Sequence, residues 1–167
     1  TEQLDPLSPR TKTQAAWNLY QGRRFDEAHK RAREVLELSP NYPTGHMQMA
    51  ASLWGMPRYE EALPYFVRFN DLIPDSGMPI YLLCFELVKL GRRDEAADLL
   101  NRLNSIAKEC YVKPYFLAMA HTALERFDEA FDYYEMALDD DEPWMVWFGT
   151  DPMLEKLRRD RRYVGIL

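Results

Sequence analysis

Phe25-Asp26-Glu27-Ala28 is the first of four short stretches that decide the fold predicted for this chain. The other three are Tyr59-Glu60-Glu61-Ala62, Arg93-Asp94-Glu95-Ala96 and Phe127-Asp128-Glu129-Ala130. The alanine that ends each stretch recurs every 34 residues without drift. A fixed period of this length is typical of one supersecondary unit that is copied several times. The sequence therefore predicts a repeat protein.

Other positions keep the same period. Three prolines, Pro6, Pro40 and Pro74, are also spaced by 34 residues. The residue twelve places before each marker alanine is small, and these residues are Ala16, Ala50, Cys84 and Ala118. Small residues at such a position allow two helices to approach closely, whereas a large side chain would overpack the contact.

This pattern resembles the tetratricopeptide repeat, in which 34 residues form two antiparallel helices with paired small residues at their crossing. The family also has an aromatic residue before the second helix, matched here by Phe25, Tyr59 and Phe127, and a proline after it. Three features depart from the pattern: Arg93 replaces one aromatic residue, Lys108 and Glu142 replace the late proline, and the early Trp-Leu-Gly part is poorly kept. The resemblance covers nearly the whole chain. It implies an all-α fold, an α-solenoid of about four helix hairpins in a right-handed superhelix with a C-terminal helical cap.

The period also predicts the division of the chain. We expect a repeat array over residues 1–142, with repeats at about 9–42, 43–76, 77–110 and 111–142, and capping helices over 143–167. The first helices are expected at 9–21, 43–55, 77–90 and 111–124, and the second at 25–38, 59–72, 93–107 and 127–140. Pro64 predicts a kink or a distorted turn in one second helix. The prolines place Leu4-Asp5-Pro6 at the end of an earlier repeat, so we expect the chain to be a piece of a longer protein.

The period breaks after Asp140. Asp151-Pro152 is a helix start and predicts a short basic helix over 153–159. A repeat array needs an atypical terminal unit that hides its last apolar face, and we expect that cover from Trp144, Trp147, Phe148, Leu154, Leu157 and Tyr163. This tail resembles the closing segment of repeat domains in bacterial regulators, where they are attached to winged-helix, adenylate cyclase or kinase domains.

Composition narrows the classes of function. Hydrophobic residues at 47% and charged residues at 29% of 167 fit a folded soluble protein. A net charge of −6 argues against direct nucleic-acid binding as the main role. The sequence has no apolar run of about 18 residues, so it predicts no membrane span. The two cysteines lie on separate helical segments, which favours reduced thiols and a cytoplasmic setting.

The sequence predicts no catalytic centre, metal or cofactor. The three histidines, His29, His46 and His121, have no metal-ligand spacing on one helix. His121 takes a position that is leucine in the other repeats, and we interpret it as a hydrogen-bonded core histidine. The acidic run over 139–142 lacks the spacing of a calcium loop and is interpreted as a solvated helix end. There is also no nucleophile elbow and no glycine-rich phosphate loop.

The resemblance implies that the first helix of each repeat lines a concave groove. Mapped by the alanine register, the predicted partner-binding residues are Arg10, Thr13, Trp17, Tyr20, Met47, Trp54, Met78, Tyr81, Phe85, Lys89, Tyr115 and Met119. Such a surface is aromatic and rich in methionine, and only two of its residues are charged. Members of the family that bind chaperone tails use lysine, arginine and asparagine here to hold a terminal carboxylate. Those residues are missing, so we do not transfer that activity.

We therefore predict a non-catalytic module that binds a peptide or helix of a partner protein in this groove, within a larger bacterial regulatory protein. Aromatic side chains offer large contact areas and methionines repack around different partners. The alternative for each side chain is packing between neighbouring first helices. Two other functions stay open: a spacer or oligomerisation domain, including a homodimer, and a ligand-sensing domain of a transcriptional regulator, cyclase or kinase.

Overall fold

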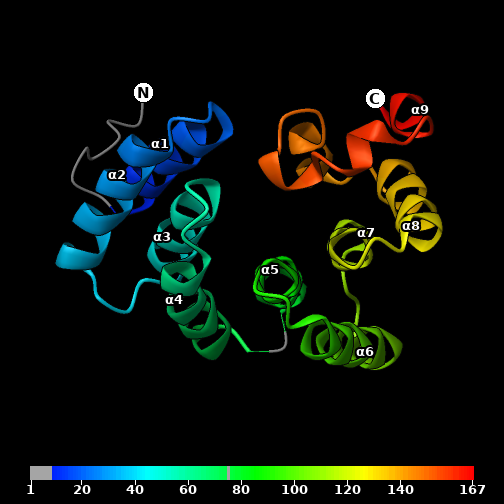
Figure 1. Ribbon diagram of the computed structural model, residues 1–167, viewed down its shortest axis with the longest axis horizontal. Helices are drawn as coiled ribbons and strands as arrows, with labels where there is room; N and C mark the ends of the chain where they lie inside the picture. Colours follow the sequence, from blue (N-terminus) through cyan, green and yellow to red (C-terminus); the bar gives the residue numbers. More distant parts are fainter. Residues whose placement is uncertain (1–8, 75) are drawn as a thin grey trace. The chain divides into compact units, whose positions relative to one another are not determined.

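A computed structural model describes residues 9–74 and 76–167 (Figure 1). The chain divides into two compact units, Thr1–Pro74 and Asp75–Leu167. Within the described residues every regular element is helical. The all-α hairpin architecture predicted from the sequence is confirmed.

The first unit holds two helix hairpins. Its helices are α1 (Pro9–Gln21), α2 (Phe25–Leu38), α3 (Pro43–Gly55) and α4 (Tyr59–Leu72). Consecutive helices pack against one another, and α1 also contacts α3. The crossing positions are close: a Cβ added at Gly55 would lie 2.4 Å from the ring of Phe25. The aromatic residue at the start of the second helix thus packs against the end of the next hairpin's first helix.

The second unit holds two further hairpins and the C-terminal cap. Its long helices are α5 (Gly77–Lys89), α6 (Arg93–Glu109), α7 (Pro114–Ala123) and α8 (Phe127–Asp139). The cap has three 3₁₀ helices, η1 (Pro143–Trp147), η2 (Pro152–Leu154) and η3 (Leu157–Arg159), followed by α9 (Tyr163–Ile166). Two short 3₁₀ helices therefore stand where one basic α-helix was predicted over 153–159. The predicted start is correct, since the side chain of Asp151 accepts a hydrogen bond from the N–H of Met153 at 2.9 Å.

Each hairpin turn is closed by the main chain. The N–H groups of Arg24, Arg58, Arg92 and Arg126 each bond a carbonyl five residues earlier, at 2.8–3.0 Å. The preceding residue has a positive φ in Arg23 (57°), Gly91 (74°) and Glu125 (60°). This is the arrangement that ends many helices with a left-handed residue. In the first hairpin that residue is Arg23, which is not a glycine.

Two helices, α6 and α7, differ from their predicted bounds for physical reasons, whereas α4 keeps its predicted bounds although Pro64 lies inside it. α6 extends to Glu109 because Lys108 stands where proline ends α2 in the first hairpin. α7 begins at Pro114 and not at Tyr111, because the proline ring favours the first helical position. α4 runs through Pro64 without interruption, since this residue lies early in the helix and removes only one internal hydrogen bond.

Candidate functional site

The first helices of the hairpins, α1, α3, α5 and α7, carry the twelve predicted binding residues, and most of these side chains are packed away from solvent. Eight are buried: Thr13, Tyr20, Met47, Trp54, Tyr81, Phe85, Tyr115 and Met119. Trp17 and Met78 are half-buried, and Arg10 and Lys89 are exposed. Only the last four present a large part of their surface to a partner.

In the first unit the aromatic residues form the core between α1, α2 and α3. Tyr20 stacks on Trp17 with ring centroids 5.3 Å apart and lies 5.6 Å from the ring of Phe25. Ala28 and Ala51 complete this cluster, and Trp17 packs against its edge. On α3, Trp54 meets Tyr59 edge-on at 6.0 Å. Trp17 on α1 and Phe25 on α2 are therefore the aromatic side chains through which this cluster reaches the surface.

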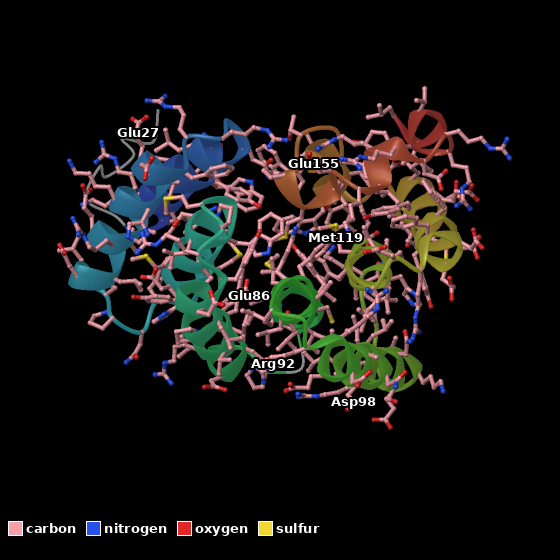
Figure 2. All side chains as sticks on the ribbon, in the orientation of Figure 1. Glu27, Glu86, Arg92, Asp98, Met119 and Glu155 are labelled. Carbon is pink, nitrogen blue, oxygen red and sulfur yellow. The ribbon has the colours of Figure 1, made fainter. Side chains whose placement is uncertain are left out.

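In the second unit an aromatic series begins on α5. Tyr81 stacks on Phe116 of α7 at 5.7 Å, and Phe116 lies 5.7 Å from Trp144 of the cap. Tyr81 is fully buried, and burial raises the pKa of its hydroxyl well above the usual value. Met119 accepts a hydrogen bond on its sulfur from the hydroxyl of Tyr134 at 3.2 Å. Figure 2 places Met119 inside this unit and Asp98 at the outer surface of α6.

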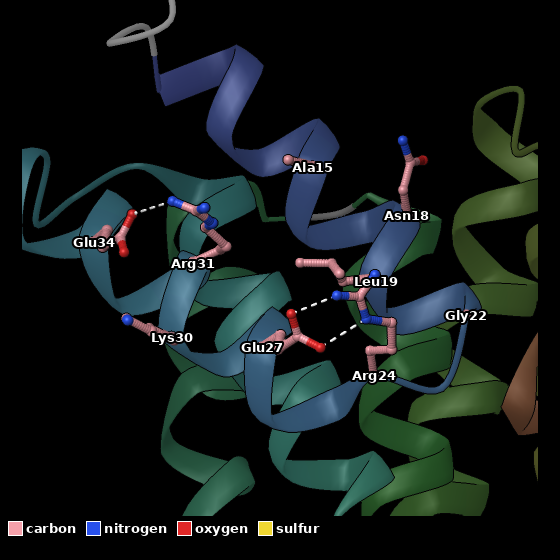
Figure 3. Close-up of a pocket in the computed structure, with 9 residues that line it drawn as sticks. All are labelled: Ala15, Asn18, Leu19, Gly22, Arg24, Glu27, Lys30, Arg31 and Glu34. Atoms are coloured by element: carbon pink, nitrogen blue, oxygen red, sulfur yellow. Dashed lines mark hydrogen bonds and ion pairs between the residues drawn. The ribbon is translucent and has the colours of Figure 1, made fainter.

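A depression of about 650 Å³ lies between α1 and α2, and the sequence reasoning missed it (Figure 3). Its lining residues are Ala15, Asn18, Leu19, Gly22, Arg24, Glu27, Lys30, Arg31 and Glu34. Two ion pairs on the α2 side line it: Arg24 binds both carboxylate oxygens of Glu27, and Arg31 binds Glu34 at 3.0 Å. The volume suits a small ligand or a side chain of a partner.

Residues at equivalent positions of the 34-residue repeat could have indicated this depression. One and three periods after the first hairpin, the corresponding faces are covered: Met49 and Ser52 on α3 are buried, as are Leu117 and Ala120 on α7. In the first hairpin the same two positions are Ala15 and Asn18, and both are exposed. The signal lay in side-chain size at the first position, where Ala15 stands in place of the large apolar Met49 and Leu117.

A second, basic hollow of about 580 Å³ lies beside the cap and is lined by Asp128, Arg159, Asp160, Arg161 and Arg162. Arg162 is engaged inside it, with ion pairs to Asp128 at 2.7 Å and to Asp160 at 2.8 Å. These bonds lower the pKa of the Asp160 carboxyl to about 2. The hollow therefore consists mainly of side chains that hold the cap on α8.

Two potentially reactive side chains, Cys84 and His121, lie in the core, where they pack against other residues. Cys84 lies in the core, where burial raises the pKa of its thiol to about 12, so it is protonated and unreactive at neutral pH. His121 is buried, but neither ring nitrogen has a hydrogen-bond partner, which corrects the expectation of a hydrogen-bonded histidine. Within the described residues no three histidine, cysteine, aspartate or glutamate side chains are grouped so that they could hold a metal ion. No helix in that part of the chain is long and apolar enough to cross a bilayer.

Comparison with solved structures settles the fold. YrrB, described as a TPR protein with an unusual peptide-binding site, matches with a TM-score of 0.55 and 16% identity, over 97% of this chain and 84% of that one. The chain has the tetratricopeptide-repeat fold. A MamA fragment from Desulfovibrio magneticus RS-1 aligns over 93% of this chain and 90% of its own, with 21% identity and a TM-score of 0.49. Neither a protein-family model nor a curated protein sequence matches this tetratricopeptide-repeat chain.

Proposed function

We propose that this tetratricopeptide-repeat chain is a non-catalytic scaffold that binds a peptide or helix of a partner protein. The observation that carries the proposal is that, in each unit taken by itself, a first helix has an exposed rim. Trp17 on α1 and Met78 on α5 are half-buried at the edge of aromatic and apolar cores, with Arg10 and Lys89 exposed on the same helices. Half-buried aromatic and methionine side chains beside a few charges are typical of peptide-binding surfaces.

The buried members of the predicted set have a supporting role in this proposal. Tyr20, Tyr81 and Tyr115 pack against neighbouring rings and fix the helices that carry the rim. Replacing Trp54 or Phe85 would therefore disturb the fold as well as binding. The partner chemistry that fits the rim is an apolar segment with a carboxylate that reaches Arg10 or Lys89.

A peptide-display selection on the intact chain tests the proposal. We expect enriched peptides to be apolar with an acidic residue. The affinity of peptides bound to the first unit should fall at least tenfold in Trp17→Ala, and that of peptides bound to the second unit at least tenfold in Met78→Ala. Val164→Ala is the control, because Val164 is exposed on α9 and lies outside the rim. Unchanged melting temperatures would show that the fold is kept. Binding that survives both rim substitutions would reject the rim as the site.

A second candidate function is association through the first hairpin, and the open depression between α1 and α2 favours it. Light scattering over a range of concentrations tests it, with Ala15→Lys as the variant that blocks the face. A monomer at every concentration would exclude a homodimer through this face.

We further propose, from the resemblance of the tail, that the scaffold belongs to a larger bacterial regulatory protein of the cytoplasm. The sequence of the complete protein would test this proposal.

A further inference from the structure

The fourth hairpin contains a buried histidine where the others contain leucine. His121 lies on α7 at the position of Leu19, Leu53 and Leu87, and only 5% of its surface is exposed. Neither Nδ1 nor Nε2 has a hydrogen-bond partner. A buried polar group without a partner destabilises the fold, and a positive charge on the ring would cost considerably more.

The ring lies in the contact between α7 and α8. Its centroid is 5.4 Å from that of Tyr133 on α8. Two charged groups act on it, Glu129 from the first turn of α8 and Arg126 from the turn before it, and their effects on the imidazole have opposite signs. The imidazole therefore sits in surroundings that offer little net compensation for a charge.

The other charges near this hairpin are already engaged. From α6, Arg93 donates to the carbonyl of Leu124 and lies 4.0 Å from Glu125. From the cap, Lys156 binds Glu125 at 2.6 Å. Lys89 at the end of α5 also acts electrostatically on Glu125. Among the acidic groups around the turn, Glu125 is thus satisfied, and Glu129 is the one that acts electrostatically on His121.

An ion pair that recurs in the first three hairpins is missing here. Arg24 binds Glu27, Arg58 binds Glu61 and Arg92 binds Glu95, each through two hydrogen bonds of 2.5–2.7 Å. The equivalent residues of the fourth hairpin are Arg126 and Glu129, and no hydrogen bond joins them in the described structure. Glu129 is therefore available for another cation in the same hairpin that carries the histidine.

We propose that His121 and Glu129 form an acid-sensitive latch in the fourth hairpin. Protonation of the imidazole makes its place between α7 and α8 unfavourable, so the ring moves outward and pairs with Glu129. The contact between the two helices then loosens, and with it the surface on which the cap is seated. At neutral pH the neutral ring fills the leucine site and the hairpin is closed.

The direction of the pH effect follows from burial. Desolvation lowers the pKa of His121 in the folded chain below its ordinary value of 6.5. The stability that this group contributes is therefore present above pH 6.5 and is lost as the pH falls towards the folded pKa. Asp151 in the same unit acts in the opposite sense, because burial raises its pKa from 3.8 to about 6 and proton uptake there favours the folded state. The histidine effect must accordingly be measured as a difference between variants.

His121→Leu is the matched variant, since it restores the residue found in the other three hairpins. Urea unfolding of wild type and variant is followed from pH 7.5 to pH 5. We expect the ratio of the two unfolding constants to rise in favour of the variant below pH 6.5, by up to about tenfold for each pH unit. A ratio that stays constant with pH would overturn the proposal.

Hydrogen exchange locates the opening and separates a latch from a general loss of stability. After correction for the intrinsic rates, amides of α7 and α8 are expected to exchange faster at pH 5.5 than at pH 7.5, and those of α2 to α4 to be unchanged. His121→Leu should abolish this local change. Glu129→Gln should weaken the outward pairing and lower the pH at which α7 and α8 open. Uniform acceleration in all helices, or an opening insensitive to both substitutions, would contradict the latch.

Discussion

The outer faces of the first and the last described hairpin differ. The outer face of the first hairpin is open: Ala15 and Asn18 are exposed, whereas the residues at the same register positions in the second and fourth hairpins are buried. The last hairpin carries Phe131 and Tyr134 on α8, and the cap covers them. Phe148 meets Tyr134 at 4.8 Å and stacks on Tyr163 at 4.5 Å.

The comparison shows two ways in which the outer face of a hairpin can differ: it can lie open with exposed small and polar residues, or it can be apolar and covered. At the open end, ion pairs on the surface replace apolar contacts, and such exposed pairs add little stability. At the covered end the cap adds an aromatic cluster and places Arg162 over the ring of Phe131 at 4.4 Å. We therefore expect mutational effects to be large at the cap and small at the first hairpin.

The largest expected effect is at the centre of the cap. Phe148→Ala should lower the free energy of unfolding of the second unit by about 3–5 kcal/mol, because it removes a fully buried ring between two others. Leu19→Ala, at the half-buried open end, should cost about 1 kcal/mol. Chemical denaturation followed by circular dichroism measures both. Equal losses would break the distinction between the covered and open ends.

Replacing a buried aspartate in the cap should raise the free energy of unfolding by an amount that depends on pH. Asp151 is 3% exposed, and burial raises its pKa to about 6. The folded state is therefore weakened above pH 6, where the carboxyl must ionise, and this weakening disappears below pH 4. Asp151→Asn keeps an acceptor for the N–H of Met153 and should raise the free energy of unfolding by about 1–3 kcal/mol at pH 7.5.

The control for Asp151→Asn is the same measurement of the free energy of unfolding at low pH. The gain should be absent at pH 3.5, where the aspartate is protonated in both states. A gain of equal size at both pH values would show that the buried charge is not its cause.

Main-chain geometry at the turns gives a smaller effect that should be similar in both units. Arg23 has φ of 57°, and Arg23→Gly should stabilise by about 0.5–1 kcal/mol because glycine adopts this region without strain. Gly91 has φ of 74° with no atom near an added Cβ, so Gly91→Ala should destabilise by about 1 kcal/mol through conformation alone. Thermal unfolding tests this pair, and changes of the same sign would contradict the explanation.

The smallest effect on stability is expected on the open face itself. Ala15→Leu with Asn18→Leu places two exposed apolar side chains there, and the free energy of unfolding should change by no more than about 0.5 kcal/mol. The same change should promote self-association, because it creates an apolar patch on an otherwise polar end. Sedimentation at increasing concentration measures the association, and a large gain in the stability of the monomer would show that the face is already covered.

The helix hairpins could be predicted from the sequence because the same pattern of residues recurs in each of them. Ala28, Ala62, Ala96 and Ala130 are all fully buried at the crossings, as the period required. The predicted ends of the helices were less accurate where one residue departs from the pattern. Lys108, for example, stands in place of a proline, and α6 is longer than predicted. The cap was recognised from its aromatic residues, but its 3₁₀ geometry depends on contacts with α8 that no local pattern encodes.

The candidate site was harder to predict, because helical periodicity identifies a face but not how much of it is covered. Tyr20 and Met119 occupy predicted groove positions yet lie in the core, since neighbouring helices pack closely over them. Trp17 and Met78 keep part of their surface only because of their place at the edge of those contacts. His121 could be assigned to the core from its register, but its lack of a hydrogen-bond partner required the surrounding helix to be seen.

The closing turns of the hairpins carry a consequence for engineering. Because main-chain hydrogen bonds set the path of each turn, arginine, proline, glycine and glutamate all occupy the corresponding site, as Arg23, Pro57, Gly91 and Glu125. Different residues can therefore be exchanged at this position of each turn. Epitopes, labels or inserted sequences can be exchanged there while the helices on either side keep their alignment.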